Sequence, residues 1–260
     1  MTRRWLVLAG GWMAVALAGC AGPSRNTLFQ TSTIDALLAG VYDGDLSLRE
    51  LRRHGNFGIG TFDDLDGEMV LLDGQFHQVR ADGRVYSPDL DGETPFAAVC
   101  RFQPERQVAV PSGLDMEGVE QLLDREAAGQ NWFAAIRMDG HFKMVRTRSV
   151  PAQSRPYPLL KDVAASQPVF TCKDIPGTIV GFRCPPYVVG VNVSGWHFHF
   201  ISRDRSFGGH LLGFEVVTGM AQVDMLDRLV MQLPATKDFA GVDLSRDRQA
   251  ELEGVEKEKK

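Results

Sequence analysis

The chain has 260 residues, 44% of them hydrophobic and 23% charged, with a formal net charge of -5 at pH 7. This composition is typical of a globular protein, and an acidic balance without a long run of Lys or Arg argues against nucleic acid as a partner. A chain of this length can bury a substantial core, either in one large domain or in two closely joined ones.

Residues 1–19 have the pattern of a bacterial export signal. Two arginines precede an apolar run that ends at Leu17-Ala18-Gly19-Cys20, which resembles a lipoprotein cleavage box. We expect a signal peptide that is removed, leaving lipidated Cys20 as the membrane contact of an exported protein on the periplasmic or cell-surface side. Because Ala21 rather than an aspartate follows the cysteine, the outer membrane is favoured. An ordinary secretory leader cleaved nearby is the alternative. A spanning helix is disfavoured, because the apolar run is shorter than the roughly 20 residues that a bilayer requires.

After a linker over residues 20–27, two helices are expected. The first begins near Ser32, and its apolar residues fall at helical spacing on one face: Ile34, Leu37, Leu38 and Val41. The second begins at Ser47, where Glu50 completes the spacing of a capping box, and ends at Gly55.

The sequence then changes to short apolar runs separated by Asp-Gly or Gly turns, which predict strands over residues 57–62, 68–72, 75–80, 83–87 and 95–102. A helix is expected over Asp115–Arg125. Two strands are expected within Trp132–Thr147, joined by a hairpin turn at Asp139-Gly140.

Pro151–Gln167 holds three of the thirteen prolines and is the candidate domain boundary. Beyond it we expect strands over residues 169–172, 178–183 and 188–193, a hairpin near residue 204, a helix over 224–233 that Pro234 ends, and a helix from about Ser245. The pattern predicts an α+β fold with mixed and antiparallel β-sheets flanked by helices. It divides into an N-terminal α/β domain over residues 28–160 and a C-terminal metal-binding, β-rich domain over residues 161–260.

Three cysteines follow Cys20, which is an odd number for an exported protein. Cys172 and Cys184 could pair in an oxidising compartment. A hairpin turn near Pro176-Gly177 would instead place Cys172 beside residues 178–181, so the pairing stays open.

The most informative motif is His197-Phe198-His199, followed by His210. Residues two apart on a strand share a face, so the first two imidazoles should point the same way. The loop over residues 202–209 is rich in Ser, Arg, Asp and Gly, and a hairpin centred between residues 204 and 205 places His210 opposite His199. Directly opposed residues have Cβ atoms about 4.5–5.5 Å apart, so the three rings should converge.

Three histidines that leave coordination positions open are the usual form of a catalytic zinc site, and imidazole also suits copper, iron and nickel. Other interpretations share this motif. A cupin-like dioxygenase would also have a glutamate shortly after the first two histidines, and residues 200–205 contain none. A hydrolytic three-histidine metalloenzyme and a non-catalytic zinc-binding lipoprotein stay open, although the chain has only six histidines in all.

Longer blocks of sequence resemble the alpha-acetolactate decarboxylases, and the resemblance runs through nearly the whole chain after the leader. The most specific blocks are Gly58–Glu68 (GIGTFDDLDGE), Val180–Arg183 (VGFR), His197–Phe200 (HFHF) and Gly208–Leu212 (GGHLL), supported by the earlier Leu28–Ser32 and Leu37–Gly44.

The resemblance implies a Zn²⁺-dependent carboxy-lyase that converts 2-acetolactate to (R)-acetoin and CO2. It implies two closely joined domains, a homodimer and a small-molecule substrate. The metal ligands map onto His197, His199 and His210, and the other active-site residues onto Glu68, Arg148 and Glu256. Glu256 is the least specific match, because Glu251 and Glu253 lie on the same expected helix.

The chemistry follows from the substrate that the resemblance implies. Loss of CO2 from a β-keto acid leaves its electrons on the ketone as an enediolate, whose charge a zinc ion can stabilise as a Lewis acid. Arg148 would orient the carboxylate through its planar fork. Glu68 and Glu256 are candidates for metal contact and proton transfer, with the two roles unassigned. The sequence contains no nucleotide-binding fingerprint or phosphate loop, so no organic cofactor is expected.

Overall fold

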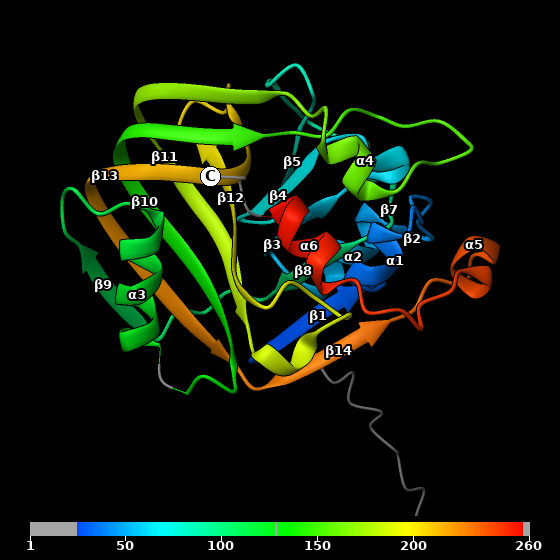
Figure 1. The fold of residues 1–260 in the computed structure, drawn as a ribbon. Helices are drawn as coiled ribbons and strands as arrows, with labels where there is room; N and C mark the ends of the chain where they lie inside the picture. The colour runs from blue at the N-terminus through cyan, green and yellow to red at the C-terminus, as the bar shows by residue number, and fades with distance from the viewer. Residues whose placement is uncertain (1–24, 128, 257–260) are drawn as a thin grey trace, which may run out of the picture.

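The structure, a computed structural model, describes residues 25–127 and 129–256 of the chain. It has a mixed α+β fold built on two large sheets, with short helices at their ends (Figure 1). The expected α+β class is confirmed. The expected signal peptide, the lipidated Cys20 and most of the expected linker lie outside the described residues.

The first sheet has seven strands in the order β14-β1-β8-β3-β4-β5-β6. Its pairs are antiparallel except for β1 with β14, which run parallel. The strands are β1 (Thr27–Thr31), β3 (Phe57–Thr61), β4 (Glu68–Leu72), β5 (Gln75–Val79), β6 (Val85–Tyr86), β8 (Ala97–Cys100) and β14 (Arg228–Gln232). Strands β3, β4, β5, β6 and β8 follow the runs that the sequence predicts, because each run is bounded by its own turn residues.

The second sheet has five strands in the order β10-β11-β12-β13-β9. Because β10 also pairs with β13, the four strands β10 to β13 form a closed barrel. The strands are β9 (Arg106–Val110), β10 (Phe133–Arg148), β11 (Val169–Cys184), β12 (Gly195–Ser202) and β13 (Gly208–Leu226). A separate ribbon joins β2 (Leu46–Ser47) to β7 (Glu93–Thr94).

Six short α-helices accompany the sheets in the described residues: α1 (Ile34–Leu38), α2 (Leu48–His54), α3 (Met116–Glu126), α4 (Leu160–Ala164), α5 (Lys237–Gly241) and α6 (Gln249–Glu256). The side chains of Thr33, Ser47 and Asp115 accept the capping hydrogen bonds of α1, α2 and α3. The predicted starts of these helices are therefore confirmed. Two 3-10 turns complete the fold, η1 (Asp63–Leu65) and η2 (Pro186–Val188).

Two expected hairpin turns are wrong. Asp139-Gly140 and Pro176-Gly177 lie in the middle of β10 and β11, which pair with each other along their length. A Cβ added to Gly140 would lie 2.6 Å from the Thr218 carbonyl oxygen, and one added to Gly177 would lie 2.3 Å from the Phe200 ring. The glycines thus permit close packing within bent strands, which local turn signals do not distinguish from a hairpin.

The helix expected over residues 224–233 is also wrong. That segment contains the end of β13 and the whole of β14, whose residues pair in parallel with β1. Pairing with a distant strand here overrides a local preference for helix. The strand expected over residues 188–193 is replaced by the end of η2 and a loop.

Cys172 and Cys184 are both free thiols, as is Cys100. They lie on the same strand, β11, twelve residues apart, which is about 40 Å along an extended strand. A disulfide needs Cα atoms within about 7 Å, so this candidate pair does not form.

The two sheets share a hydrophobic core. Phe57 and Val70 of the seven-stranded sheet pack in one cluster with Ala135 and Phe182 of the five-stranded sheet. Each sheet takes strands from both sides of residue 160, since β14 joins the first sheet and β9 the second. The division into domains at that residue stays a prediction. Within the described residues, no helix is long and apolar enough to cross a membrane.

Gly209 is expected to be essential to the hairpin that carries His210. Its φ is +130°, and an added Cβ would lie 2.5 Å from the Arg148 carbonyl oxygen. Gly209→Ala should therefore lower the free energy of unfolding by about 1–3 kcal/mol through strain, with a further cost from the contact. Denaturant unfolding measures this effect. Gly213→Ala on the same strand is the matched control, because its added Cβ meets nothing within 4 Å; equal stability of the two variants would contradict the prediction.

Candidate metal centre and active site

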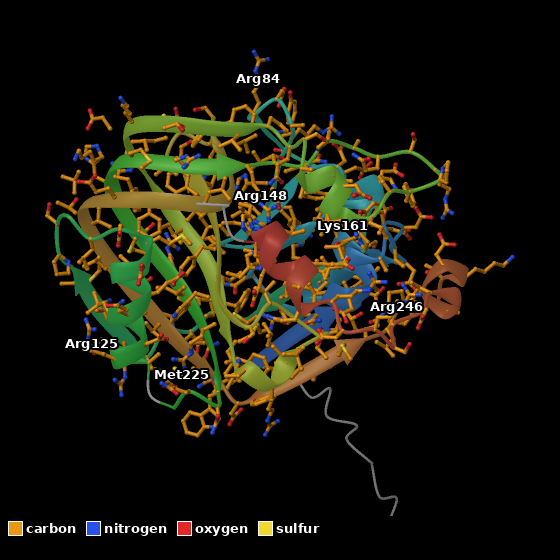
Figure 2. All side chains as sticks on the ribbon, in the orientation of Figure 1. Arg84, Arg125, Arg148, Lys161, Met225 and Arg246 are labelled. Atoms are coloured by element: carbon orange, nitrogen blue, oxygen red, sulfur yellow. The ribbon has the colours of Figure 1, made fainter. Side chains whose placement is uncertain are left out.

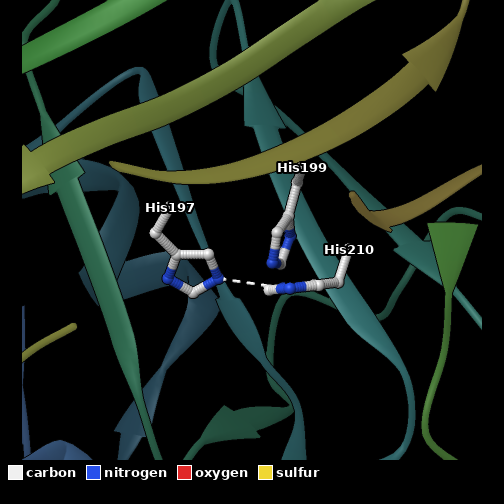
Figure 3. A group of neighbouring side chains, drawn as sticks. All are labelled: His197, His199 and His210. Atoms are coloured by element: carbon white, nitrogen blue, oxygen red, sulfur yellow. Dashed lines mark hydrogen bonds between the residues drawn. The ribbon is translucent and has the colours of Figure 1, made fainter. Parts of the chain in front are cut away.

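Three histidines converge on one point between β12 and β13. His199 pairs directly with His210 in the register of these strands, as the hairpin centred near residue 204 predicts. His197 lies two residues earlier on β12 and presents its ring to the same face (Figure 3). Within the described residues, one ligand atom from each of the three lies within 4.8 Å of the others. The convergence expected from the sequence is therefore found.

Hydrogen bonds fix the orientation of the rings. His199 Nδ1 lies 2.8 Å from the carbonyl oxygen of Met69 on β4, so this nitrogen donates and Nε2 keeps its lone pair. His197 Nε2 and His210 Nδ1 are 3.0 Å apart. Two nitrogen ligands of one tetrahedral zinc lie about 3.3 Å apart, given Zn–N bonds of about 2.0–2.1 Å. The spacing of these nitrogens therefore fits a small divalent ion.

The protonation states of the histidines fit the same role. Burial, together with the nearby Arg148 guanidinium, lowers the pKa of His197 to about 3. Burial likewise holds the pKa values of His199 and His210 well below their usual range. The three imidazoles are therefore neutral at pH 7, which is the form that binds metals.

Two carboxylates lie beside the histidines. Glu68 begins β4, and its Oε2 lies 3.5 Å from His199 Nε2. Glu256 ends α6, and its Oε2 lies 3.5 Å from His210 Nε2 and 3.7 Å from His197 Nε2. These glutamates could complete the coordination of an ion or exchange protons with a substrate beside it.

Burial dominates the electrostatics of both glutamates. It raises the pKa of Glu68 to about 7, against the opposing effect of Arg148. It also raises the pKa of Glu256, which Arg148 counters through its charge and a hydrogen bond. A carboxyl group that titrates near neutral pH can act as a general acid or base under ordinary conditions.

Arg148 lies at the end of β10, where it pairs in register with His210 (Figure 2). Its side chain is 4% exposed. Nη1 donates to Gln167 Oε1 at 3.0 Å, and Nη2 donates to Glu256 Oε1 at 3.3 Å. Nε is buried and has no hydrogen-bond partner among the described residues. The guanidinium thus retains a donor for an anionic ligand.

All six residues that the sequence analysis singles out line one pocket. Its polar wall is formed by Glu68, Arg148, His197, His199, His210, Glu256 and Thr61. Its apolar wall is formed by Ile34, Leu37, Gly60, Leu65, Phe96, Val150, Leu160 and Val255. Such a pocket suits a small anion that carries apolar groups.

The structure also separates Glu256 from its neighbours on α6. Glu251 pairs with Arg248, and Glu253 accepts a hydrogen bond from Gln249, so neither takes part in the contacts described above. Two further contributors, Gln167 and the Met69 carbonyl, were not found from the sequence. Gln167 lies in a proline-rich segment without a recognisable motif, and a backbone carbonyl has no sequence signal at all.

The comparisons with known proteins identify the family of this chain. Residues 28–246 match the family model described as alpha-acetolactate decarboxylase. The chain belongs to the alpha-acetolactate decarboxylase family. A Methanosarcina mazei member is 46% identical over 234 residues, covering 90% of this chain and 81% of that protein. A Methylococcus capsulatus member is 41% identical, covering 90% of both chains.

Solved structures of family members have the same fold. The crystal structure of the enzyme from Bacillus subtilis strain 168 superposes with a TM-score of 0.87 at 36% identity, covering 89% of this chain and all of that one. A Staphylococcus aureus protein described as similar to the family superposes with a TM-score of 0.84 at 31% identity, covering 88% of this chain and all of the other. The family and its α+β fold are therefore established for this chain.

Proposed function

We propose that this protein decarboxylates 2-acetolactate to (R)-acetoin and CO2 at a Zn²⁺ ion held by His197, His199 and His210. The observation that carries the proposal is the convergence of three neutral imidazoles on one point in the pocket that also contains Arg148. Membership of the alpha-acetolactate decarboxylase family supports the substrate and the reaction.

The donor set supports zinc as the metal. Three neutral imidazole nitrogens, with carboxylate oxygens nearby, are ligands that zinc accepts in catalytic sites. When bound, the ion would supply Lewis-acid stabilisation of the negative charge that develops as CO2 departs. The hairpin of β12 and β13 supplies all three nitrogens, and Met69 holds the ring of His199 from the other sheet.

Arg148 is proposed to bind and orient the substrate carboxylate. Its Nε is unpaired within the described part of the chain, while its two terminal nitrogens are held by Gln167 and Glu256. A guanidinium held in this way keeps the carboxylate in one orientation relative to the ketone. The apolar wall of the pocket accommodates the methyl groups and keeps bulk water away from the reacting carbon.

Glu68 is proposed to deliver the proton that replaces the carboxyl group. Breaking the bond to CO2 leaves an electron pair on the former carboxyl-bearing carbon, delocalised into the ketone, and this carbon must take up one proton. Burial raises the pKa of Glu68 to about 7, so a protonated fraction is present at neutral pH. Since Glu256 is bonded to Arg148, we assign it to holding the guanidinium. Delivery from one side would give a single enantiomer.

Glu68→Gln is expected to lower kcat by about 10²–10⁴-fold, the usual contribution of a positioned general acid. Glutamine keeps the shape of the side chain and cannot supply the acidic proton. Turnover, bound metal and the enantiomeric ratio of acetoin are the quantities to measure. Wild-type turnover with unchanged stereochemistry would assign the proton transfer to another group.

The proposed function is tested by incubating the purified protein with racemic acetolactate and measuring acetoin by chiral chromatography. We expect (R)-acetoin without a requirement for oxygen, and loss of activity after chelation. Oxygen-dependent products would favour the cupin-like interpretation, and ester hydrolysis without acetoin would favour a hydrolytic metalloenzyme. Metal binding without any turnover would favour a zinc-binding lipoprotein.

We also propose that the protein is a homodimer. Strand β14 lies at one edge of the seven-stranded sheet and exposes Leu229, Val230 and Met231. An exposed apolar edge strand is suited to pairing with a second copy of itself. Light scattering after size-exclusion chromatography measures the assembly, and a monomeric mass at working concentrations would contradict this proposal.

Export and lipidation at Cys20 are proposals that rest on the sequence pattern of residues 1–20. Mass spectrometry of the N-terminal peptide from membranes tests them. The expected result is a peptide that begins at diacylated Cys20, and an unmodified N-terminus in the soluble fraction would refute the anchor.

A further inference from the structure

A group of exposed side chains outside the active site lies close to the first described residues of the chain. Trp132 is 52% exposed, Tyr187 is 65% exposed and Val189 is 53% exposed. The Tyr187 hydroxyl donates to the carbonyl oxygen of Asn131 at 2.9 Å, which joins these segments into one surface. We call Trp132, Tyr187 and Val189 the aromatic patch.

Backbone pairing connects the aromatic patch to the start of β1. The carbonyl oxygen of Asn26 accepts hydrogen bonds from the backbone N–H groups of Asp227 and Arg228. One residue earlier, Leu226 pairs in register with Phe133, the neighbour of Trp132. The start of β1 and the end of β13 therefore meet at the same lower edge of the molecule, where Figure 2 labels Met225.

The chain between this edge and Cys20 is short. Six residues, 20–25, precede Asn26, and fully extended they reach at most about 20 Å. A lipid on Cys20 would thus hold the edge that carries the aromatic patch close to the bilayer surface.

The chemistry of the aromatic patch suits that position. Trp and Tyr side chains are enriched at membrane interfaces, where an apolar ring and a polar group are both accommodated. Arg228 is 65% exposed at the same edge and Arg25 is also exposed, so cations can face anionic headgroups, although Asp227 lies beside Arg228.

We propose that the aromatic patch is a membrane-docking surface that inserts into the lipid interface and fixes the orientation of the anchored protein. The acyl chains on Cys20 would attach the protein to the bilayer through a short segment but would not fix its orientation, and contact of the aromatic patch with the lipid interface would supply that. The inference rests on the proposed lipid anchor and adds the protein surface that faces the bilayer.

The test separates docking from natural lipidation by replacing the anchor. A protein that carries a hexahistidine tag in place of residues 1–20 is captured on vesicles of phosphatidylethanolamine and phosphatidylglycerol containing a nickel-chelating lipid. Beyond the leader the chain has only two tryptophans, Trp132 and Trp196, so quenching by brominated acyl chains reports their depth. The Trp132→Phe variant measures how much of the quenching comes from Trp196.

Met220→Trp in the Trp132→Phe background is the matched reporter on another surface. Met220 is 44% exposed and lies on β13. It precedes Asp227 by seven residues, which is about 23 Å along an extended strand. We expect brominated lipid to quench Trp132 severalfold more than the Met220→Trp reporter, together with a blue shift of its emission.

Equal quenching of the two reporters, or none at Trp132, would overturn the proposal. Absence of quenching at Trp132 is also the result expected if a protein partner rather than lipid covers the aromatic patch. Because the tag replaces Cys20, these outcomes do not depend on whether the natural chain is lipidated or on its activity toward acetolactate.

Discussion

Replacing His199 by alanine is expected to remove the bound metal and to lower kcat/KM by more than about a thousandfold. Changes to groups that only support a metal ligand already cost about 10–100-fold in affinity or activity, and His199 is proposed as a ligand itself. Its Nδ1 bonds the Met69 carbonyl oxygen, which leaves Nε2 as the nitrogen that faces the metal. Elemental analysis and acetoin formation measure the two effects.

His141→Ala is the matched control for this variant. His141 is 40% exposed and pairs with Asp174, away from the pocket, so its loss should leave metal content and turnover unchanged. Substantial acetoin formation by a metal-free His199→Ala protein would refute the assignment of the metal centre.

Arg148→Lys is expected to retain metal but to lower kcat/KM by about thirtyfold or more. Truncating one partner of a buried, hydrogen-bonded charge pair costs about 2–5 kcal/mol. A lysine ammonium cannot bond Gln167 and Glu256 while also presenting a planar fork to a carboxylate. Steady-state kinetics with metal analysis separates this loss from a loss of the ion.

Arg137→Lys is the control on the same strand. Arg137 bonds Asp73 and Asp139 at the surface, and its substitution should not change turnover. If Arg148→Lys turns over at the wild-type rate, the carboxylate is oriented by another group.

The histidine hairpin could be predicted because its determinants are local. Alternation along a strand fixes the shared face of His197 and His199, and the loop centred near residue 204 fixes the partner of His199. Arg205 adopts a φ of +59°, as a tight turn requires, although it is not a glycine. A motif contained in fourteen residues therefore gives most of the geometry of the metal centre.

The rest of the fold depends on contacts between distant segments. Residues 228–232 form a strand only because β1, some two hundred residues earlier, offers an edge. Gly140 and Gly177 have turn-forming sequences but are needed where bent strands approach each other closely. Sequence signals that act over a few residues cannot anticipate such pairings.

The residues around the three histidines likewise include some that the sequence indicates and some that only the structure reveals. Glu68 and Arg148 were placed through the family resemblance, and the structure brings both into the pocket of the histidines. Gln167 reaches Arg148 only because the segment after β10 folds back over the site, and nothing in its local sequence indicates this contact. Glu256 is distinguished from Glu253 only by the face of α6 that meets the hairpin.

The measurement that tests the account most directly is a zinc titration of the chelated protein, with acetoin formation followed at each addition. Three imidazoles that hold one ion predict no turnover without metal, then a linear rise that ends at one equivalent per chain. His199→Ala should show no such rise. Full turnover by the metal-free wild-type protein would contradict the account.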